Sequence, residues 1–338
     1  MEKKNYLKKL GMRSLSLLMT LVCVSVATHF LQSTAFAEGG NIVYSVYVEN
    51  QSQNQYGASL FIKSYNGIPV PLTTLQQNIF DFSPTWSPDG SKVAFIREDY
   101  GATYLVVIDA DGRNENVLYQ NEYVSDPTWS PDGSKIGFTL GNDTTFLGRL
   151  YNNCGRKTKG YIATISVATK SVTTYPNTEY GTDPTWSPDG NTIAFVRTRV
   201  DNGIFSLNVS NGVVTPLLNV TFPADPEWSS DGTKLVYGKD YNDAGLCNGV
   251  MKGTGGLIPA PIYGGKIVVH NFSTGTEQTL VDSLGSAPDW SPSGSSVLFS
   301  NSLNSSNTHQ LFTVNSSGGT SIVVPNAQNW ATSSSWTY

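Results

Sequence analysis

A short pattern built around Trp-Ser-Pro-Asp-Gly returns along the chain and constrains its fold more than any other feature. Five copies occupy residues 84–95, 127–138, 184–195, 226–237 and 288–299. The fourth copy has Ser230 in place of the second proline, the fifth has Ser293 in place of the aspartate, and a shortened sixth copy ends the sequence. The tryptophans are spaced 43, 57, 42, 62 and 46 residues apart. A base period of about 42, lengthened twice by insertions, is typical of a four-stranded propeller blade.

The residues of each copy predict strands and tight turns. In Ser-Pro-Asp-Gly, proline presets φ at the first central position and glycine supplies a positive φ at the exit. An alternating strand follows, as at 92–96, and further strands are expected near 104–109 and 117–119. Asp-Gly and Asn-Gly pairs at 111–112, 211–212 and 66–67 indicate hairpins between such strands. The aspartates of the Ser-Pro-Asp-Gly segments are therefore expected to be turn residues, and the tryptophans to pack between blades.

The two ends of the chain are expected to complete one blade together. The sixth copy supplies a single strand, whereas residues 41–47, 58–62 and 69–72 look like a second, third and fourth strand. We therefore expect an all-β, six-bladed β-propeller that is closed by pairing of the N- and C-terminal strands, with the segment around Val43 against Trp336. Closure would protect the sheet edges that an open array exposes.

The pattern Asp-Pro-x-Trp-Ser-Pro-Asp-Gly resembles the WD40-like repeat of the TolB-type β-propellers. In these copies a small polar residue, a Lys or Thr, and an apolar pair with an aromatic residue follow it. The resemblance covers essentially the whole chain after residue 37. It implies binding of a partner protein at the channel mouth without identifying the partner, and the family also includes domains attached to enzymes.

The first 37 residues predict a signal peptide. A basic segment ends at Arg13, an apolar stretch covers 15–27, and Ala35-Phe36-Ala37 is a small-x-small cleavage site. The apolar stretch is shorter than the roughly 20 residues of a membrane-spanning helix. We expect cleavage before Glu38, a single propeller domain over 38–338, no membrane span after cleavage, and a monomer that is secreted or located in the periplasm or cell envelope.

The charge balance argues against nucleic acid as a partner. Of 21 basic and 26 acidic residues, five and one lie in the first 37 positions, which leaves 16 and 25 in the remainder and a net charge of −9. Nucleic-acid binding depends on neutralising phosphates with clustered basic side chains.

Two long insertions, at about 141–159 and 238–265, fall in the loops between the second and third strands of their blades. They should project from one face of the propeller, which we call the insertion face. Cys154 and Cys247 lie in them and are candidates for a disulfide, with two unpaired thiols as the alternative. Tyr151, Arg156, Tyr241 and Tyr263 are candidates for contacts with a protein, peptide or glycan, although ordinary solvated loops would have a similar composition.

Three aspartates are candidates for a binding site at the channel mouth. Asp126, Asp183 and Asp225 precede the first proline of three successive copies and so begin the innermost strands. Together they could bind a cation or a cationic partner. Carboxylates suit calcium, but no motif indicates it, and no metal site or cofactor is predicted. The alternative is that each carboxylate accepts hydrogen bonds from nearby backbone N–H groups.

Catalysis has little support in the sequence. After residue 37 the histidines are His270 and His309, on strands of different blades, and no Gly-x-Ser-x-Gly segment occurs. A binding or interaction module is therefore the predicted function. Two alternatives stay open: an extracellular carbohydrate-active enzyme using channel-mouth carboxylates as acid and base, and a structural surface-layer component.

Overall fold

The computed structural model describes residues 40–50, 55–121, 123–141, 160–197, 201–239, 265–303, 308–327 and 331–337. The chain divides into two compact units, Met1–Glu38 and Gly39–Tyr338. All described elements belong to the second unit, and they are strands apart from one 3-10 turn, η1 (Pro176–Thr178). No helix among the described residues has the length and apolarity needed to cross a membrane.

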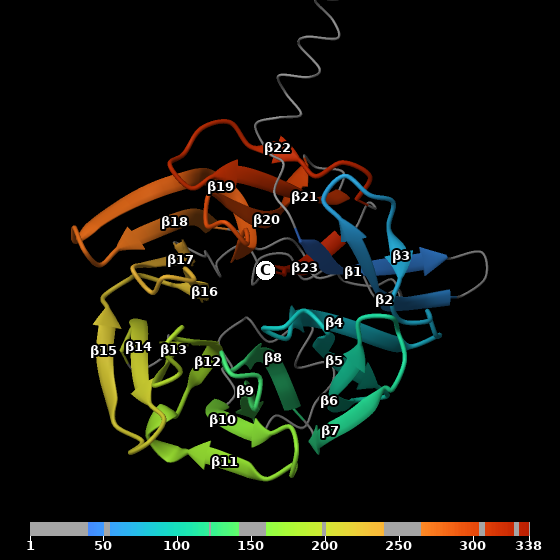
Figure 1. The fold of residues 1–338 in the computed structure, drawn as a ribbon, viewed down its shortest axis with the longest axis horizontal. Coiled ribbons are helices and arrows are strands. Elements are labelled where there is room, and N and C mark those ends of the chain that lie inside the picture. Colours follow the sequence, from blue (N-terminus) through green and yellow to red (C-terminus); the bar gives the residue numbers. More distant parts are fainter. Residues whose placement is uncertain are drawn as a thin grey trace, which may run out of the picture. The chain divides into compact units, whose positions relative to one another are not determined.

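Antiparallel pairing groups the strands in fours, arranged around a central axis (Figure 1). Blade 1 contains β4 (Ile79–Trp86), β5 (Lys92–Asp99), β6 (Ala102–Asp109) and β7 (Asn116–Asn121). Blade 2 contains β8 (Tyr123–Trp129), β9 (Lys135–Gly141), β10 (Gly160–Ser166) and β11 (Val172–Tyr175). Blade 3 contains β12 (Gly181–Trp186), β13 (Thr192–Arg197), β14 (Gly203–Asn208) and β15 (Val214–Leu218).

The next two blades share a long strand, β19 (Thr276–Trp290). Its first half is the outer strand of blade 4, after β16 (Ala224–Trp228), β17 (Lys234–Lys239) and β18 (Gly265–Asn271). Its second half is the innermost strand of blade 5, before β20 (Ser296–Leu303), β21 (Thr308–Asn315) and β22 (Ile322–Val323). The chain is thus an all-β propeller whose innermost strands carry the repeated tryptophans.

Blade 6 is assembled from both ends of the described chain. It contains β23 (Ala331–Trp336), β1 (Asn41–Asn50), β2 (Gln55–Ser64) and β3 (Val70–Pro71). The expected terminal pairing is present, because Ile42 lies opposite Trp336 and Val43 opposite Ser335. The Trp336 ring also stacks on Tyr65, with ring centroids 5.6 Å apart.

The outer strand of blade 6 is shorter than the expected 69–72. β3 pairs with β2 at only two positions, Phe61 with Pro71 and Ile62 with Val70. Pro69 and Pro71 have no N–H group to donate, so the ladder cannot extend far along this edge.

The repeat tryptophans pack between blades, as predicted. Trp129 of blade 2 lies in one buried cluster with Ala94 and Ile96 of blade 1. Its indole Nε1 donates a hydrogen bond to the carbonyl of Thr85, at 3.2 Å. Trp186 and Trp290 occupy similar clusters at other blade boundaries.

The Ser-Pro-Asp-Gly segments form the expected turns. In the first, Asp89 Oδ1 accepts hydrogen bonds from the Ser87 hydroxyl at 2.6 Å and from the Ser91 backbone N–H at 3.0 Å. Gly90 has φ 67°, and the corresponding glycine of each other full copy lies between 68° and 71°. The hydrogen bond from Ser87 is the leading cause that lowers the pKa of Asp89 to about 2. The aspartates of these turns are accounted for by turn chemistry.

Substitution of Ser293 by Asp should stabilise the fifth turn. Ser293 Oγ stands where the aspartate stands elsewhere and accepts the Ser295 backbone N–H at 3.2 Å. A carboxylate would form stronger, charge-assisted bonds, so we expect the free energy of unfolding at pH 7 to rise by about 0.5–1 kcal/mol. A carboxyl group whose pKa is lower in the folded than in the unfolded chain stabilises the fold at pH values above its unfolded pKa. This stabilisation is lost as pH falls and the carboxylate is protonated. Urea denaturation should therefore show the gain at pH 7 and none at pH 2; a gain equal at both would contradict the explanation.

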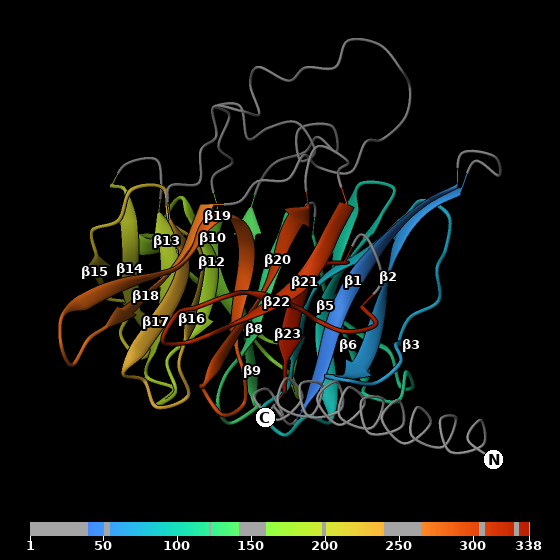
Figure 2. The same cartoon turned by 90° about the horizontal axis from the view of Figure 1, so that it is seen from above.

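Figure 2 shows the propeller from the side; the two insertions are the segments from β9 to β10 and from β17 to β18. Both join the second strand of a blade to its third, as expected. Most of each insertion, including Cys154 and Cys247, lies outside the described residues. The same holds for the four candidate contact residues there, Tyr151, Arg156, Tyr241 and Tyr263.

Candidate functional site at the channel mouth

A bulge in the innermost strands places the predicted aspartates. The register of β8 against β9 shifts between Ser125 and Thr128, and β12 and β16 shift at the same repeat position. The residue before the first proline has a positive φ in every copy, for example 52° at Asp126 and 48° at Ala287. Aspartate is enriched in this region of φ, and a bulge redirects a side chain. Because Ala287 adopts it as well, the conformation belongs to the blade rather than to the carboxylates.

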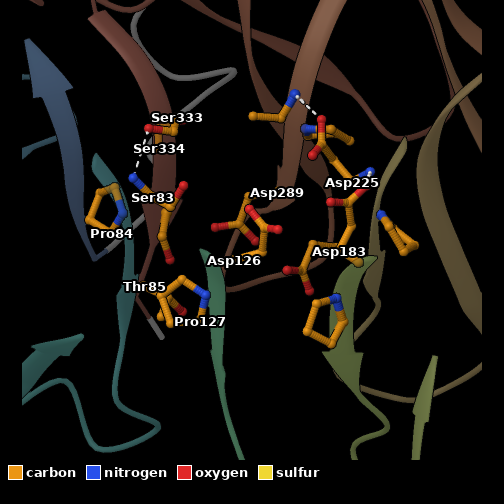
Figure 3. A pocket seen from close by; sticks show the side chains of 16 residues that line it. Ser83, Pro84, Thr85, Asp126, Pro127, Asp183, Asp225, Asp289, Ser333 and Ser334 are labelled. Carbon is orange, nitrogen blue, oxygen red and sulfur yellow. Dashed lines mark hydrogen bonds between the residues drawn. The ribbon is translucent and has the colours of Figure 1, made fainter. Parts of the chain in front are cut away.

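The predicted aspartates come together at one cavity on the channel axis. Asp126, Asp183 and Asp225 line this space of about 120 Å³, which we call the mouth cavity. Figure 3 shows Ser83, Ser333 and Ser334 on one side and Asp183 and Asp225 on the other. The expected convergence is therefore observed, and the lining is divided between hydroxyl and carboxylate groups.

Two further carboxylates, which were not predicted from the sequence, also line the mouth cavity. Glu227 and Asp289 stand between the proline and the tryptophan of the fourth and fifth copies, where the first three copies have threonine. Departure from threonine at this position was the signal that could have found them. The described residues that line the cavity include five carboxylates and no Lys, Arg or His.

The carboxylates also join neighbouring blades. Asp183 Oδ2 accepts the backbone N–H of Asp225 at 3.5 Å, and Asp225 Oδ2 accepts that of Ala287 at 3.2 Å. Where the copy has serine, the hydroxyl acts alike: Ser333 Oγ accepts the backbone N–H of Ser83 at 3.2 Å. Asp183 and Asp225 therefore accept backbone hydrogen bonds, as the alternative interpretation expected, and also line the cavity.

The two carboxylates between the proline and the tryptophan, Glu227 and Asp289, also form hydrogen bonds between blades. Asp289 Oδ2 accepts the backbone N–H of Trp336 at 2.6 Å, which attaches blade 5 to the closing strand β23. Glu227 Oε2 accepts the Thr185 hydroxyl at 2.8 Å. These carboxylates therefore stabilise the contacts between blades and also line the mouth cavity.

Burial raises the pKa of four of the five carboxyl groups. It raises the pKa of Asp126, and with the charges of Asp126 and Asp225 it holds that of Asp183 well above its usual range. Burial and then the charge of Asp289 raise the pKa of Glu227 to about 8, and burial raises that of Asp289 to about 7. Glu227 and, in part, Asp289 therefore keep a proton at pH 7, which a bound cation could replace.

No metal geometry is apparent in the described part of the chain. No group of three or more His, Cys, Asp or Glu side chains there is placed to hold a metal ion. His270 lies on β18 of blade 4, and His309 is buried on β21 of blade 5. Neither histidine is among the described residues that line the mouth cavity.

Comparison with known proteins agrees with the geometry. The model of the TolB β-propeller domain matches residues 39–252. The fold resembles TolB from Acinetobacter baumannii, with TM-score 0.68 and 21% identity over 88% of this chain and 66% of that one. It also resembles hydrazine synthase from Kuenenia stuttgartiensis, with TM-score 0.62 and 13% identity over 89% and 47%. An oligogalacturonate lyase in complex with manganese gives TM-score 0.53 and 17% identity over 86% and 82%. No curated protein matches the sequence.

Proposed function

Because the chain belongs to the TolB β-propeller domain family, we propose that it is a binding module whose mouth cavity holds a positively charged group of a protein or peptide partner. The observation that carries the proposal is the convergence of five carboxylates on a cavity with no basic side chain among its described lining residues. A volume of about 120 Å³ suits the end of one Arg or Lys side chain rather than a whole domain.

The energetics favour a cationic group over water in this cavity. Carboxylates that burial and mutual repulsion disfavour gain most from an opposite charge nearby. Asp225 lies in the middle of the group and adds to the repulsion at both Asp183 and Glu227. A guanidinium group could contact two carboxylates at once through its planar fork.

Replacement of Asp183 by Asn should weaken binding of a basic peptide without a comparable change elsewhere. Asparagine keeps an acceptor for the Asp225 N–H and cannot ionise beside a bound cation. We expect affinity for a fluorescein-labelled Gly-Ser-Gly-Arg-Gly-Ser-Gly peptide at pH 8.5 to fall about tenfold, roughly 1.4 kcal/mol. Fluorescence anisotropy would measure it.

Asp189→Asn is the matched control, because Asp189 belongs to the same copy but lies exposed in the turn. It makes the same change in net charge outside the cavity. Equal affinities of the two variants, or no binding of the arginine peptide by the unsubstituted protein, would contradict the proposal. A peptide with glutamine in place of arginine should not bind.

The second candidate function is a carbohydrate-active enzyme. One observation favours it: Glu227, with its pKa raised to about 8, is protonated at neutral pH and could act as a general acid. Release of reducing ends from extracellular polysaccharides by the unsubstituted protein and not by Glu227→Gln would establish this function in place of the binding module.

The setting of the binding module is part of the proposal. Cleavage before Glu38 would deliver a monomer to the cell exterior, the periplasm or the envelope. The insertions would flank the mouth cavity, with Tyr151, Arg156, Tyr241 and Tyr263 adding contacts to a protein, peptide or glycan. A Cys154–Cys247 disulfide would tie the insertions together.

A further inference from the structure

The channel has a second, larger cavity at the face that carries the Ser-Pro-Asp-Gly turns. This turn-face cavity has a volume of about 370 Å³. It shares four lining residues with the mouth cavity, namely Thr85, Glu227, Asp289 and Ser335. The two carboxylates therefore form its inner end, and they are the only charged side chains among its described lining residues.

Aromatic and proline side chains form the walls of the turn-face cavity. Five repeat tryptophans line it: Trp86, Trp129, Trp186, Trp228 and Trp336. So do Pro88, Pro131 and Pro188, and at the fourth copy Ser230 takes the proline position.

Each of these prolines lies near a turn glycine of the next blade. The position of a β-carbon added to Gly133 would be 3.9 Å from Pro88 Cδ, and that for Gly190 would be 3.8 Å from Pro131 Cδ. Only an added side-chain atom at these glycines would reach van der Waals distance of the proline rings, so each turn lies close to the proline of the preceding blade.

Several indole N–H groups at this cavity lack acceptors. Trp129 Nε1 donates to the Thr85 carbonyl, whereas Nε1 of Trp86, Trp186 and Trp228 is buried without an acceptor in the described part of the chain. Trp86 and Trp186 are each 6% exposed. A buried donor without an acceptor is costly, and these three are neighbours of a cavity large enough for a ligand.

We propose that the turn-face cavity binds a small organic cation, a protonated primary amine that carries an aromatic ring. The ring would lie among the tryptophan and proline side chains, and the ammonium group would reach Glu227 and Asp289 at the inner end. Ligand pockets of about 300–1,000 Å³ with apolar walls and a few polar groups are typical of small-molecule sites. Aromatic walls also attract cations directly.

The protonation of the inner carboxylates supports a charged ligand. The charges of Asp289 and Asp225 add to burial in raising the pKa of Glu227, and no basic side chain of the described residues is among the causes that shift the pKa of Glu227 or Asp289. Alkylammonium groups, like the Lys side chain at about 10.4, keep their proton through this range. Amine binding must therefore displace protons from the carboxyls, and affinity should rise between pH 6 and pH 8.5.

Isothermal titration calorimetry with phenethylamine tests the chemical class. We expect saturable binding at pH 8.5, at least tenfold weaker binding at pH 6, and at least tenfold weaker binding of both 2-phenylethanol and ethylamine. The first analogue lacks the charge and the second lacks the ring. Equal heats for phenethylamine and 2-phenylethanol, or no saturable binding, would overturn the proposal.

Ser230→Phe tests the location. Ser230 is exposed and lines the cavity, so a phenyl group there should occupy part of it and weaken phenethylamine binding at least tenfold. Ser273→Phe makes the same substitution in the exposed β18–β19 hairpin and should leave affinity unchanged. Equal affinities for these two variants would overturn the assignment.

The two sites can be tested separately. Ser230→Phe should retain the arginine-peptide affinity of the mouth cavity, because Ser230 does not line that cavity. Loss of phenethylamine binding with peptide binding retained would support the turn-face site alone. Peptide binding without any phenethylamine binding would sustain the mouth proposal and overturn this one.

Discussion

Arg97→Met is expected to lower the free energy of unfolding by about 3–5 kcal/mol. Arg97 forms a bidentate pair with Asp81, with Nε at 2.7 Å from Oδ1 and Nη2 at 3.0 Å from Oδ2. Asp81 is 1% exposed, and its backbone carbonyl also accepts the Ser45 hydroxyl of blade 6. Removal of the guanidinium leaves a buried carboxylate without its cation at the junction of blades 1 and 6. Urea denaturation at pH 7 measures the loss.

The third copy offers a matched control, because Arg197 occupies the same repeat position. Its guanidinium donates to the Asn177 carbonyl at 2.8 Å and lies 4.6 Å from the centre of the Phe205 ring. Arg197→Met should cost only about 1 kcal/mol. Similar losses for both arginines would contradict the explanation. If Arg97→Met does not fold, the double variant Asp81→Asn/Arg97→Met should recover folding, since it removes the buried charge as well.

Glu227→Gln is expected to raise the free energy of unfolding at pH 8.5 by about 1–2 kcal/mol. Burial and the charge of Asp289 raise the pKa of Glu227 to about 8, above its value in the unfolded chain. Between these two values the folded protein binds the extra proton, so its stability falls as pH rises toward 8. Glutamine keeps an oxygen acceptor for the Thr185 hydroxyl and cannot ionise. The measurement is urea denaturation at pH 5 and pH 8.5.

The expected signature is a gain at pH 8.5 and little change at pH 5, where Glu227 is already protonated. Asp189→Asn should change the free energy of unfolding in the opposite direction. Its hydrogen bond from Ser187 leads the causes that lower the pKa of Asp189, so the carboxylate stabilises the fold at neutral pH and its loss should destabilise. If Glu227→Gln lowered stability at pH 8.5, the carboxyl would be favourably placed in the fold and its high pKa would need another cause.

A stability gain in Glu227→Gln would bear directly on function. Glu227 would then lower the stability of the fold at a position where other copies have threonine. Such a side chain is expected to be kept for a reason other than folding. Loss of cation binding in the same variant would supply that reason. Stability and binding should then change in opposite directions at Glu227.

Much of the fold was predictable because the residues of each copy specify its turns and strands locally. Proline, aspartate and glycine set the turns, the alternation of apolar residues set the strands, and the tryptophan marked each innermost strand. Pairing of the segment around Val43 with Trp336 followed from the missing strands of the last copy. The convergence of Asp126, Asp183 and Asp225 followed from their equal place in the repeat. The strand β3 is shorter than expected, because two prolines lack the N–H groups that its ladder would need.

The carboxylate cluster was only partly visible in the sequence. Glu227 and Asp289 are far apart in the chain, and each looks like a single departure from threonine at a variable position. Their shared location depends on the rotation between blades, which no local pattern encodes. The same rotation brings an aspartate oxygen within hydrogen-bond distance of a backbone N–H of the next blade.

The repeating unit, its strands and turns, and the joining of the two ends could be predicted from the order of residues, since these depend on contacts within about 45 residues or on counting strands. The assembled propeller was needed to show which side chains share the channel, how their charges interact, and that two cavities meet at Glu227 and Asp289. Burial and electrostatic interaction act between side chains brought together around an axis, and these distances arise only when the ring is assembled.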